Sequence, residues 1–250
     1  MKRKTIALAM FLVAGVAHAD SKDALVEAVR AKDASKINAI LDQEPTLASA
    51  RTAKGASMVQ LAALQLKDEE TFVCTRENPM LQAVLAHKPE LDIFDAALVG
   101  DERRVAALLA ADPGRATALH PLGWRPLHFA SFGGKTEVAK LLLAKGAVID
   151  ERAKNKFENT ALQTGLLCGE ADVVKLLLEK GANPNVRQNE GFAPMHLAAE
   201  LGRTDLVELL LAHGAAVNPR SDKGESPLGT ALKKKRNEVA ELLRSKGGAP

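Results

Sequence analysis

The stretch "GWRPLHFASFGGKTEVAKLLLAKGA", residues 123–147, decides the fold. Its second half, "KTEVAKLLLAKGA" (135–147), returns as "EADVVKLLLEKGA" (170–182), "RTDLVELLLAHGA" (203–215) and "RNEVAELLRSKGG" (236–248). A shorter helical pattern precedes each copy, and the position of Gly123 recurs at Glu158, Gly191 and Gly224, a period of 33 to 35 residues. Such a period predicts a repeat architecture, in which each unit buries its apolar face against its neighbours.

Weaker copies extend the repeat toward the N-terminus. The segments "DALVEAVRAKDASKINAILDQEP", "GASMVQLAALQL" and "IFDAALVGDERRVAALLAADP" fit parts of the same two-helix pattern. They predict three degenerate units. Together with the four clear copies they make seven units across residues 20–250, the last one a C-terminal cap, and these units begin near residues 21, 55, 89, 123, 158, 191 and 224.

Local signals place the ends of the helices within each unit. Ser57, Thr160 and Ser226 stand where a side chain can accept free backbone N–H groups at a helix start, whereas Arg125 and Ala193 cannot cap in this way. Gly146, Gly181 and Gly214 follow the leucine-rich runs, where a left-handed residue ends a helix. Near the two ends of the array, polar residues stand where the inner units have apolar residues or glycine; these are Lys36, Lys235 and Arg244. The run "KKKR" (233–236) is interpreted as part of a solvated cap.

These motifs resemble the ankyrin-repeat family. "RPLHFASFGG", "APMHLAAELG" and the three "LLL" segments closely match that family's signature, specifically over 123–248 and more loosely over 21–122. The resemblance implies an all-α solenoid of stacked helix-turn-helix units with short β-hairpin fingers. It also implies binding to other proteins as the usual role, and hydrogen bonds from His128 and His196 to neighbouring hairpins.

The motif "GGKT" (133–136) raises the alternative of a phosphate-binding loop. That loop needs a glycine five residues before Gly134, and Phe129 stands there; it also needs a preceding strand, where the pattern is helical. We therefore expect "GGKT" to be a turn between two helices. No nucleophile, base or metal cluster has the spacing of a known site, so the sequence predicts no catalytic residues, no metal and no cofactor.

The first 19 residues have the pattern of a signal peptide. Three basic residues precede an apolar run, and "AHA" supplies a cleavage site between Ala19 and Asp20. We therefore expect a periplasmic or secreted protein without a stable membrane span after cleavage. Three of the 34 Lys and Arg residues but none of the 31 acidic residues lie in this segment, so the mature chain is formally neutral, which argues against a nucleic-acid partner.

Two cysteines, Cys74 and Cys168, would lie in a compartment that permits disulfides. Three repeats separate them, about 30 Å on helix diameters, so the regular stack predicts no bond between them. Cys168 is then expected to be a small buried residue, and Cys74 a free thiol or an intermolecular link. Cys74 belongs to an insertion of about ten residues within 67–79, which is either loop drift or a dedicated contact.

Aromatic and basic residues suggest where a partner binds. The chain has eight aromatic residues. Four of them fall on the fingers and first helices that line the concave face of such solenoids, with basic residues on the finger rims. The predicted protein-binding residues are Trp124, Phe129, Phe157, Phe192, Arg152, Lys156 and Arg187. Packing of the aromatic residues against the next finger is the alternative interpretation.

The sequence therefore predicts a non-catalytic scaffold that binds another protein, an envelope protein in an exported chain, and inhibits or stabilises it. It predicts no small-molecule substrate. Two alternatives remain. One is an enzyme with an unrecognised site near the 67–79 insertion, and the other is a structural protein that associates with itself.

Overall fold

The structure, a computed structural model that describes residues 20–64 and 78–250, is helical where the repeat predicts helices. The chain forms two compact units, Met1–Leu91 and Asp92–Pro250. Within the described ranges, the one β pairing outside named strands is an antiparallel bridge between Arg51 and Ser57. The all-helical repeat fold is therefore confirmed.

The first unit contains the first two degenerate copies, and the third forms the first helix pair of the second unit. Residues 20–30 are helical, followed by α2 (Ala34–Gln43), the 3-10 helix η1 (Pro45–Ser49), α3 (Met58–Leu64) and α4 (Pro79–Ala86). α4 packs against both α2 and α3. Asn78 joins α3 to α4, because its side-chain oxygen accepts the Leu81 N–H at 3.0 Å while its amide donates to the Ala62 carbonyl at 2.8 Å.

The second unit contains five helix pairs in sequence. They are α5 (Ile93–Val99) with α6 (Glu102–Ala111), α7 (Pro126–Phe132) with α8 (Thr136–Ala144), α9 (Ala161–Cys168) with α10 (Ala171–Glu179), α11 (Pro194–Leu201) with α12 (Thr204–Ala212), and α13 (Pro227–Lys233) with α14 (Asn237–Ser245). Two 3-10 helices, η2 (Pro113–Thr117) and η3 (Asn189–Gly191), lie in the connections.

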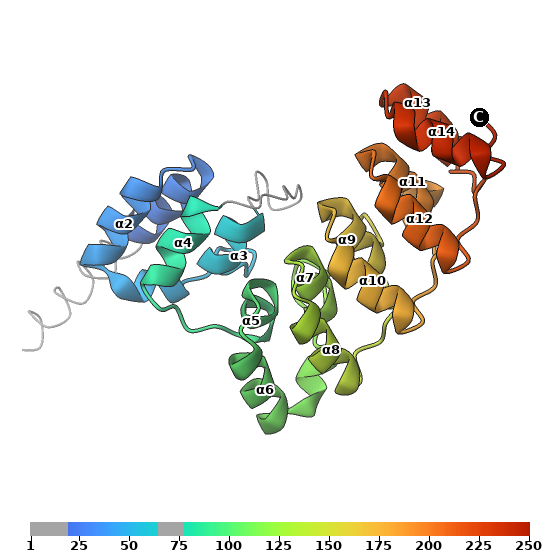
Figure 1. Ribbon diagram of the computed structural model, residues 1–250. Helices are drawn as coiled ribbons and strands as arrows, with labels where there is room; N and C mark the ends of the chain where they lie inside the picture. Colours follow the sequence, from blue (N-terminus) through green and yellow to red (C-terminus); the bar gives the residue numbers. More distant parts are fainter. Residues whose placement is uncertain (1–19, 65–77) are drawn as a thin grey trace, which may run out of the picture. The chain divides into compact units, whose positions relative to one another are not determined.

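The pairs of the second unit stack in chain order (Figure 1). Each first helix contacts the first helix of the next pair, from α5 through α7, α9 and α11 to α13, and each second helix contacts the next second helix, from α6 to α14. Val173, Leu176 and Leu177 of α10 are buried between these neighbours. Fully burying one such leucine contributes about 1.5–3 kcal/mol, which only an adjacent pair can provide.

The predicted helix starts are confirmed by their hydrogen bonds. The hydroxyl oxygens of Ser57, Thr160 and Ser226 accept backbone N–H groups at 3.0, 3.4 and 3.0 Å. Arg125 and Ala193 precede α7 and α11 without a side-chain capping bond. The helix ends behave as predicted too, since Gly146, Gly181 and Gly214 have φ angles of 91°, 89° and 83°.

The motif "GGKT" is the turn between α7 and α8, so the phosphate-loop reading is excluded. Gly134 has a φ of 65°, and the N–H of Lys135 donates to the carbonyl of Ala130 at the end of α7. Lys235 takes the same place before α14 with a φ of 57°, although it is not a glycine. Lys36, Lys235 and Arg244 are all exposed, as the expected polar ends require.

No helix among the described residues combines the length and apolar character needed to cross a membrane. The predicted signal peptide and its cleavage site at Ala19 lie outside the described residues, as does most of the 67–79 insertion.

Candidate functional site

Four fingers project between the helix pairs of the second unit, at residues 118–125, 151–160, 186–193 and 219–226; we call them fingers four to seven. Each is closed by one backbone hydrogen bond of 2.8 or 2.9 Å. The donor and acceptor pairs are His120 and Trp124, Ala153 and Asn159, Gln188 and Phe192, and Ser221 and Glu225. The predicted hairpin fingers are thus present as tight turns, too short to form named strands.

Backbone hydrogen bonds also join each finger to the one before it. The N–H of Lys154 donates to the Gly123 carbonyl at 2.7 Å. The N–H groups of Asn189 and Asp222 donate in the same way to the carbonyls of Phe157 and Glu190, each at 3.0 Å. Fingers four to seven therefore form one continuous hydrogen-bonded row, in which the side chains are held at a fixed spacing.

Five of the seven predicted binding residues are accessible on this row. Arg152, Lys156 and Arg187 are exposed, and Phe157 and Phe192 are half-buried. The Lys156 ammonium lies 5.3 Å from the centre of the Phe157 ring, a cation–π geometry. The structure thus places Lys156 against Phe157 on finger five and carries Arg187 and Phe192 on finger six, the next finger of the row.

Arg187 is held in place by neighbouring groups. Its Nε donates to the Gly191 carbonyl at 2.9 Å, and one terminal nitrogen donates to the Arg220 carbonyl at 2.7 Å and to Asp222 at 2.9 Å. These bonds span fingers six and seven. An exposed ion pair alone contributes little to stability, but the three bonds together fix the direction in which the guanidinium points.

The assignment of Trp124 and Phe129 as accessible binding residues is wrong. Their exposed fractions are 1% and 0%, because both belong to a buried aromatic cluster around α7. The Trp124 ring packs edge-on against Phe129 at 5.2 Å between ring centres, and Phe129 packs against His120 at 5.3 Å and Phe94 at 5.6 Å. A partner cannot reach these rings, so they stabilise the stack instead.

His128 and His196 have the bridging role that the family resemblance implied. Nδ1 of each ring accepts the N–H at the start of its own helix, from Arg125 at 3.3 Å and from Ala193 at 3.1 Å. Nε2 faces the carbonyl of the next unit, Asn159 for His128 at 3.1 Å and Glu225 for His196 at 2.9 Å. Since Nδ1 accepts a bond, the neutral ring carries its proton on Nε2 and donates to that carbonyl.

Gln163 makes the equivalent bridge between the two units that lie between the bridges of His128 and His196. The sequence analysis did not predict this bridge. Its Oε1 accepts the Thr160 N–H at 3.0 Å and its Nε2 donates to the Val186 carbonyl at 2.9 Å. The signal was available, because Gln163 occupies the position of His128 and His196 in the repeat and an amide offers the same acceptor and donor pair.

A second inter-unit contact was also missed. The side-chain oxygens of Asp150, Asn185 and Asn218 accept the N–H groups of Asn183, Ala216 and Ala249 in the following unit, at 3.0, 2.8 and 2.8 Å. The recurrence of Asp or Asn four residues after Gly146, Gly181 and Gly214 is the sequence signal for it.

Finger five also borders an open hollow of about 590 Å³. Val148, Arg152 and Lys154 line it, and its acidic side chains have partners: Glu151 pairs with Arg125 at 2.7 Å, and Glu158 with Arg152 at 3.3 Å. The hollow is open to solvent and most of the residues that line it are charged, so it suits contact with a surface side chain better than enclosure of a small molecule.

The described residues hold no group of three or more His, Cys, Asp or Glu side chains that could bind a metal ion. Burial is the main cause that lowers the pKa of His128 to about 4, and it also lowers the pKa of His196. Both rings are committed to inter-unit hydrogen bonds, so neither is poised as a catalytic base.

The expectation that Cys168 is a small buried residue is wrong. It is half-buried at the C-terminal end of α9, and its sulfur is in a disulfide. Cys74, the second cysteine of the sequence, lies outside the described residues. The regular spacing of the units therefore does not decide the oxidation state of Cys168.

Comparison with known proteins agrees with this geometry. A family model for ankyrin repeats in three copies matches residues 93–188 and 182–249. One similar protein is the E3 ubiquitin-protein ligase XB3 of Oryza sativa subsp. japonica, which is 38% identical over 97 residues, a match that covers 38% of this chain and 21% of the rice protein. The chain thus spans about a fifth of the length of that relative.

Proposed function

Because the chain belongs to the ankyrin-repeat family, a family of protein-interaction scaffolds, we propose that it is a non-catalytic scaffold that binds one protein partner through fingers five and six. The observation that carries the proposal is the rigid finger row. Its backbone bonds join finger five, with Arg152, Lys156 and Phe157, to finger six, with Arg187 and Phe192. A surface already ordered before binding loses less conformational entropy when the partner docks.

The residue types on this surface support a protein partner. Aromatic and arginine side chains are enriched among the residues that contribute most to protein interfaces. The cations on fingers five and six alternate with Glu158 and Glu190, so the surface has no large field of one sign. This mixed character suits a folded protein surface better than a nucleic acid, which needs a basic footprint.

We propose further that the scaffold works outside the cytoplasm, in the cell envelope. The signal-peptide pattern of residues 1–19 supports export. The disulfide at Cys168 supports an oxidising compartment, because cytosolic thiols are kept reduced. An envelope protein, inhibited or stabilised by the contact, is the partner that fits this location. N-terminal sequencing of the purified mature protein tests the export step, with Asp20 expected as the first residue.

The ligase activity in the name of the rice relative is not part of this proposal, since the shared segment is about a fifth of that protein. An enzymatic role gains no support from the described residues, whose perturbed histidines both bridge units. Self-association remains the competing binding mode. Native mass spectrometry of residues 20–250 would reveal self-association as a dimer or larger species. A second copy of the chain would then be the partner of the finger surface.

The binding test compares alanine variants of basic residues on finger five (the finger variants) with alanine variants of exposed lysines on the second helices α8 and α10 (the outer-helix variants). Residues 20–250 are used to capture a partner from envelope extract, and the purified partner is then titrated against Lys156→Ala, Arg152→Ala, Lys140→Ala and Lys175→Ala. All four lysine or arginine side chains are exposed. We expect the finger variants to weaken binding about tenfold or more, a loss of about 1.4 kcal/mol, and the outer-helix variants to bind normally. Equal affinity for all four variants would reject the finger surface.

A further inference from the structure

We call the contact between one helix pair and the next finger a seam. Three consecutive seams of the second unit are bridged by a side chain at the same repeat position, two of them by histidine and one by glutamine. His128 bridges the seam from α7 to finger five, Gln163 the seam from α9 to finger six, and His196 the seam from α11 to finger seven. All three side chains are at least 99% buried. The two histidines can take up a second proton, and the glutamine cannot.

A second proton on either histidine would break the bond at its Nδ1 atom, while the Nε2–H group would still donate to the carbonyl of the next unit. The Nδ1 atom of His128 accepts the Arg125 N–H, and that of His196 accepts the Ala193 N–H. Protonated Nδ1 has no lone pair left, so two N–H groups would face each other at the start of the helix. The new positive charge would also lie near the positive end of the helix dipole and away from water.

The charged groups around His128 offset one another. Arg125, at the start of its own helix, and Glu151, on finger five, form an ion pair of 2.7 Å, so neither acts alone on the ring. Of the helices packed on α7, α5 carries the buried Asp95, and α8 carries Glu137 and Lys140, which pair with each other at the surface. α9 carries no acidic or basic side chain.

The surroundings of His196 have the same character. Glu225 of the next unit and Arg187 of finger six are the charged groups that act on it. Glu225 is already paired with Lys233 of α13 at 3.5 Å, and Asp205 of α12 is paired with Arg203 at 2.6 Å. The two charges that act on the His196 ring therefore oppose each other, and Glu225 is shared with Lys233.

We propose that acid opens this stack at two defined seams, those bridged by His128 and His196, and leaves the seam bridged by Gln163 closed. The two helix pairs between them, together with fingers five and six (residues 151–218), then stay together as a block while the neighbouring pairs separate from it. The two histidine-bridged seams then act as proton-sensitive hinges, one on each side of fingers five and six. This opening does not depend on which partner the protein binds.

The direction follows from the titration of the two rings. Burial, opposed by the bond to the Asn159 carbonyl, lowers the pKa of His128 from 6.5 to about 4, so the opened seam binds a proton more readily than the closed one. The stability of that seam is complete above pH 6.5 and is lost as the pH falls toward 4. The opening equilibrium should rise about thirtyfold between about pH 8 and about pH 5.

Each seam has its own reporter in the backbone of the finger row. The N–H of Lys154 reports the first seam, that of Asn189 the second and that of Asp222 the third, because each donates across to the preceding finger. Amide hydrogen exchange of residues 20–250, corrected for the intrinsic pH dependence, gives a protection factor for each. Between about pH 8 and pH 5 we expect protection of Lys154 to fall about thirtyfold, that of Asp222 to fall and that of Asn189 to stay constant.

Glutamine supplies the matched variants, since this chain already uses it at the middle seam. His128→Gln should remove the acid dependence at Lys154 alone, His196→Gln should remove it at Asp222 alone, and Gln163→His should create it at Asn189. Equal acid dependence of all three seams in the unmodified chain would overturn the proposal. So would an acid dependence that persists at Lys154 in a folded His128→Gln protein. If one variant does not fold at neutral pH, the other two still decide.

Discussion

The side chain of Asn185 closes the end of the following unit, because its amide nitrogen donates to the carbonyl of Gly214 at 3.0 Å. Asn218 repeats the contact one unit later, with Gly247 as the acceptor at 2.8 Å. Asp150 stands at the same repeat position but has no N–H group to donate, so it makes only the accepting half of the contact.

Replacing Asp150 with Asn should therefore stabilise the protein. The new amide supplies a donor for the carbonyl at the end of α10 and removes a negative charge from the negative end of that helix. We expect a gain of about 1 kcal/mol in the free energy of unfolding, measured by urea denaturation. Asn185→Asp is the matched control and should lose a similar amount. A change in the same direction for both variants would contradict the contact.

Replacing Trp124 with Ala should destabilise the fold, not only a partner interface. The indole is 1% exposed and packs against Phe129 and Phe132. Truncation leaves a cavity in the aromatic cluster, with an expected loss of about 3–5 kcal/mol in the free energy of unfolding. Phe192→Ala, at the same repeat position but half-buried, should cost less. Unchanged stability of Trp124→Ala would show that the ring is not part of the core.

Replacing Lys235 with Gly should raise the melting temperature. Lys235 is exposed and has a φ of 57°, a left-handed conformation that costs a non-glycine residue about 1–2 kcal/mol. Gly202 takes the equivalent place one unit earlier, with a φ of 77°. Its replacement by Ala is the opposing control, because a Cβ atom there would lie 2.6 Å from Cδ of Arg236. Thermal unfolding followed by circular dichroism should separate the two, and a lower melting temperature for Lys235→Gly would refute the strain.

Cys168 should resist alkylation until the protein is reduced. Its side chain is half-buried, so the disulfide and not burial protects the sulfur from a small reagent such as iodoacetamide. Peptide mass spectrometry under native conditions should find the Cys168 peptide unlabelled before reduction and labelled after it. Labelling without a reductant would mean that the thiol is free.

The repeat pattern predicted most of the fold because each signal is local. A hydroxyl at residue 57, 160 or 226 can cap a helix from its own position, and the glycines at 146, 181 and 214 need only their own backbone angle. The bridges of His128 and His196 could be transferred from the family, since the residue type and its place in the repeat both matched.

The accessible surface was harder to predict, because it depends on neighbours that the repeat does not specify. Trp124 and Phe192 share a position in the repeat, yet one is enclosed by Phe129 and Phe132 while the other is half-exposed. Helix spacing likewise gives the distance between regular units, but it carries no information about the chemistry at the exposed end of α9, where Cys168 lies. The bridge made by Gln163 was not predicted, because glutamine is a different residue type from histidine although its amide offers the same acceptor and donor pair.

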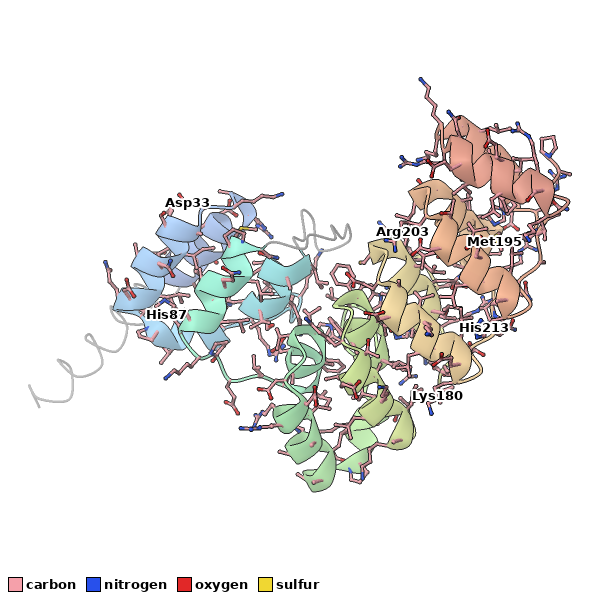
Figure 2. All side chains as sticks on the ribbon, in the orientation of Figure 1. Asp33, His87, Lys180, Met195, Arg203 and His213 are labelled. Carbon is pink, nitrogen blue, oxygen red and sulfur yellow. The ribbon has the colours of Figure 1, made fainter. Side chains whose placement is uncertain are left out.

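Several of the side chains that join one unit to the next bind backbone atoms of the neighbouring unit. The carbonyl of Asn159 receives His128, that of Gly169 receives Arg203, which is labelled in Figure 2, and that of Gly214 receives Asn185. Since every residue has a carbonyl, these junctions make few demands on the sequence of the neighbouring module. A duplicated copy of residues 191–223, spliced in frame behind the original, would meet compatible acceptors on both sides. The chain can thus lengthen by whole modules during evolution while its exposed residues diverge.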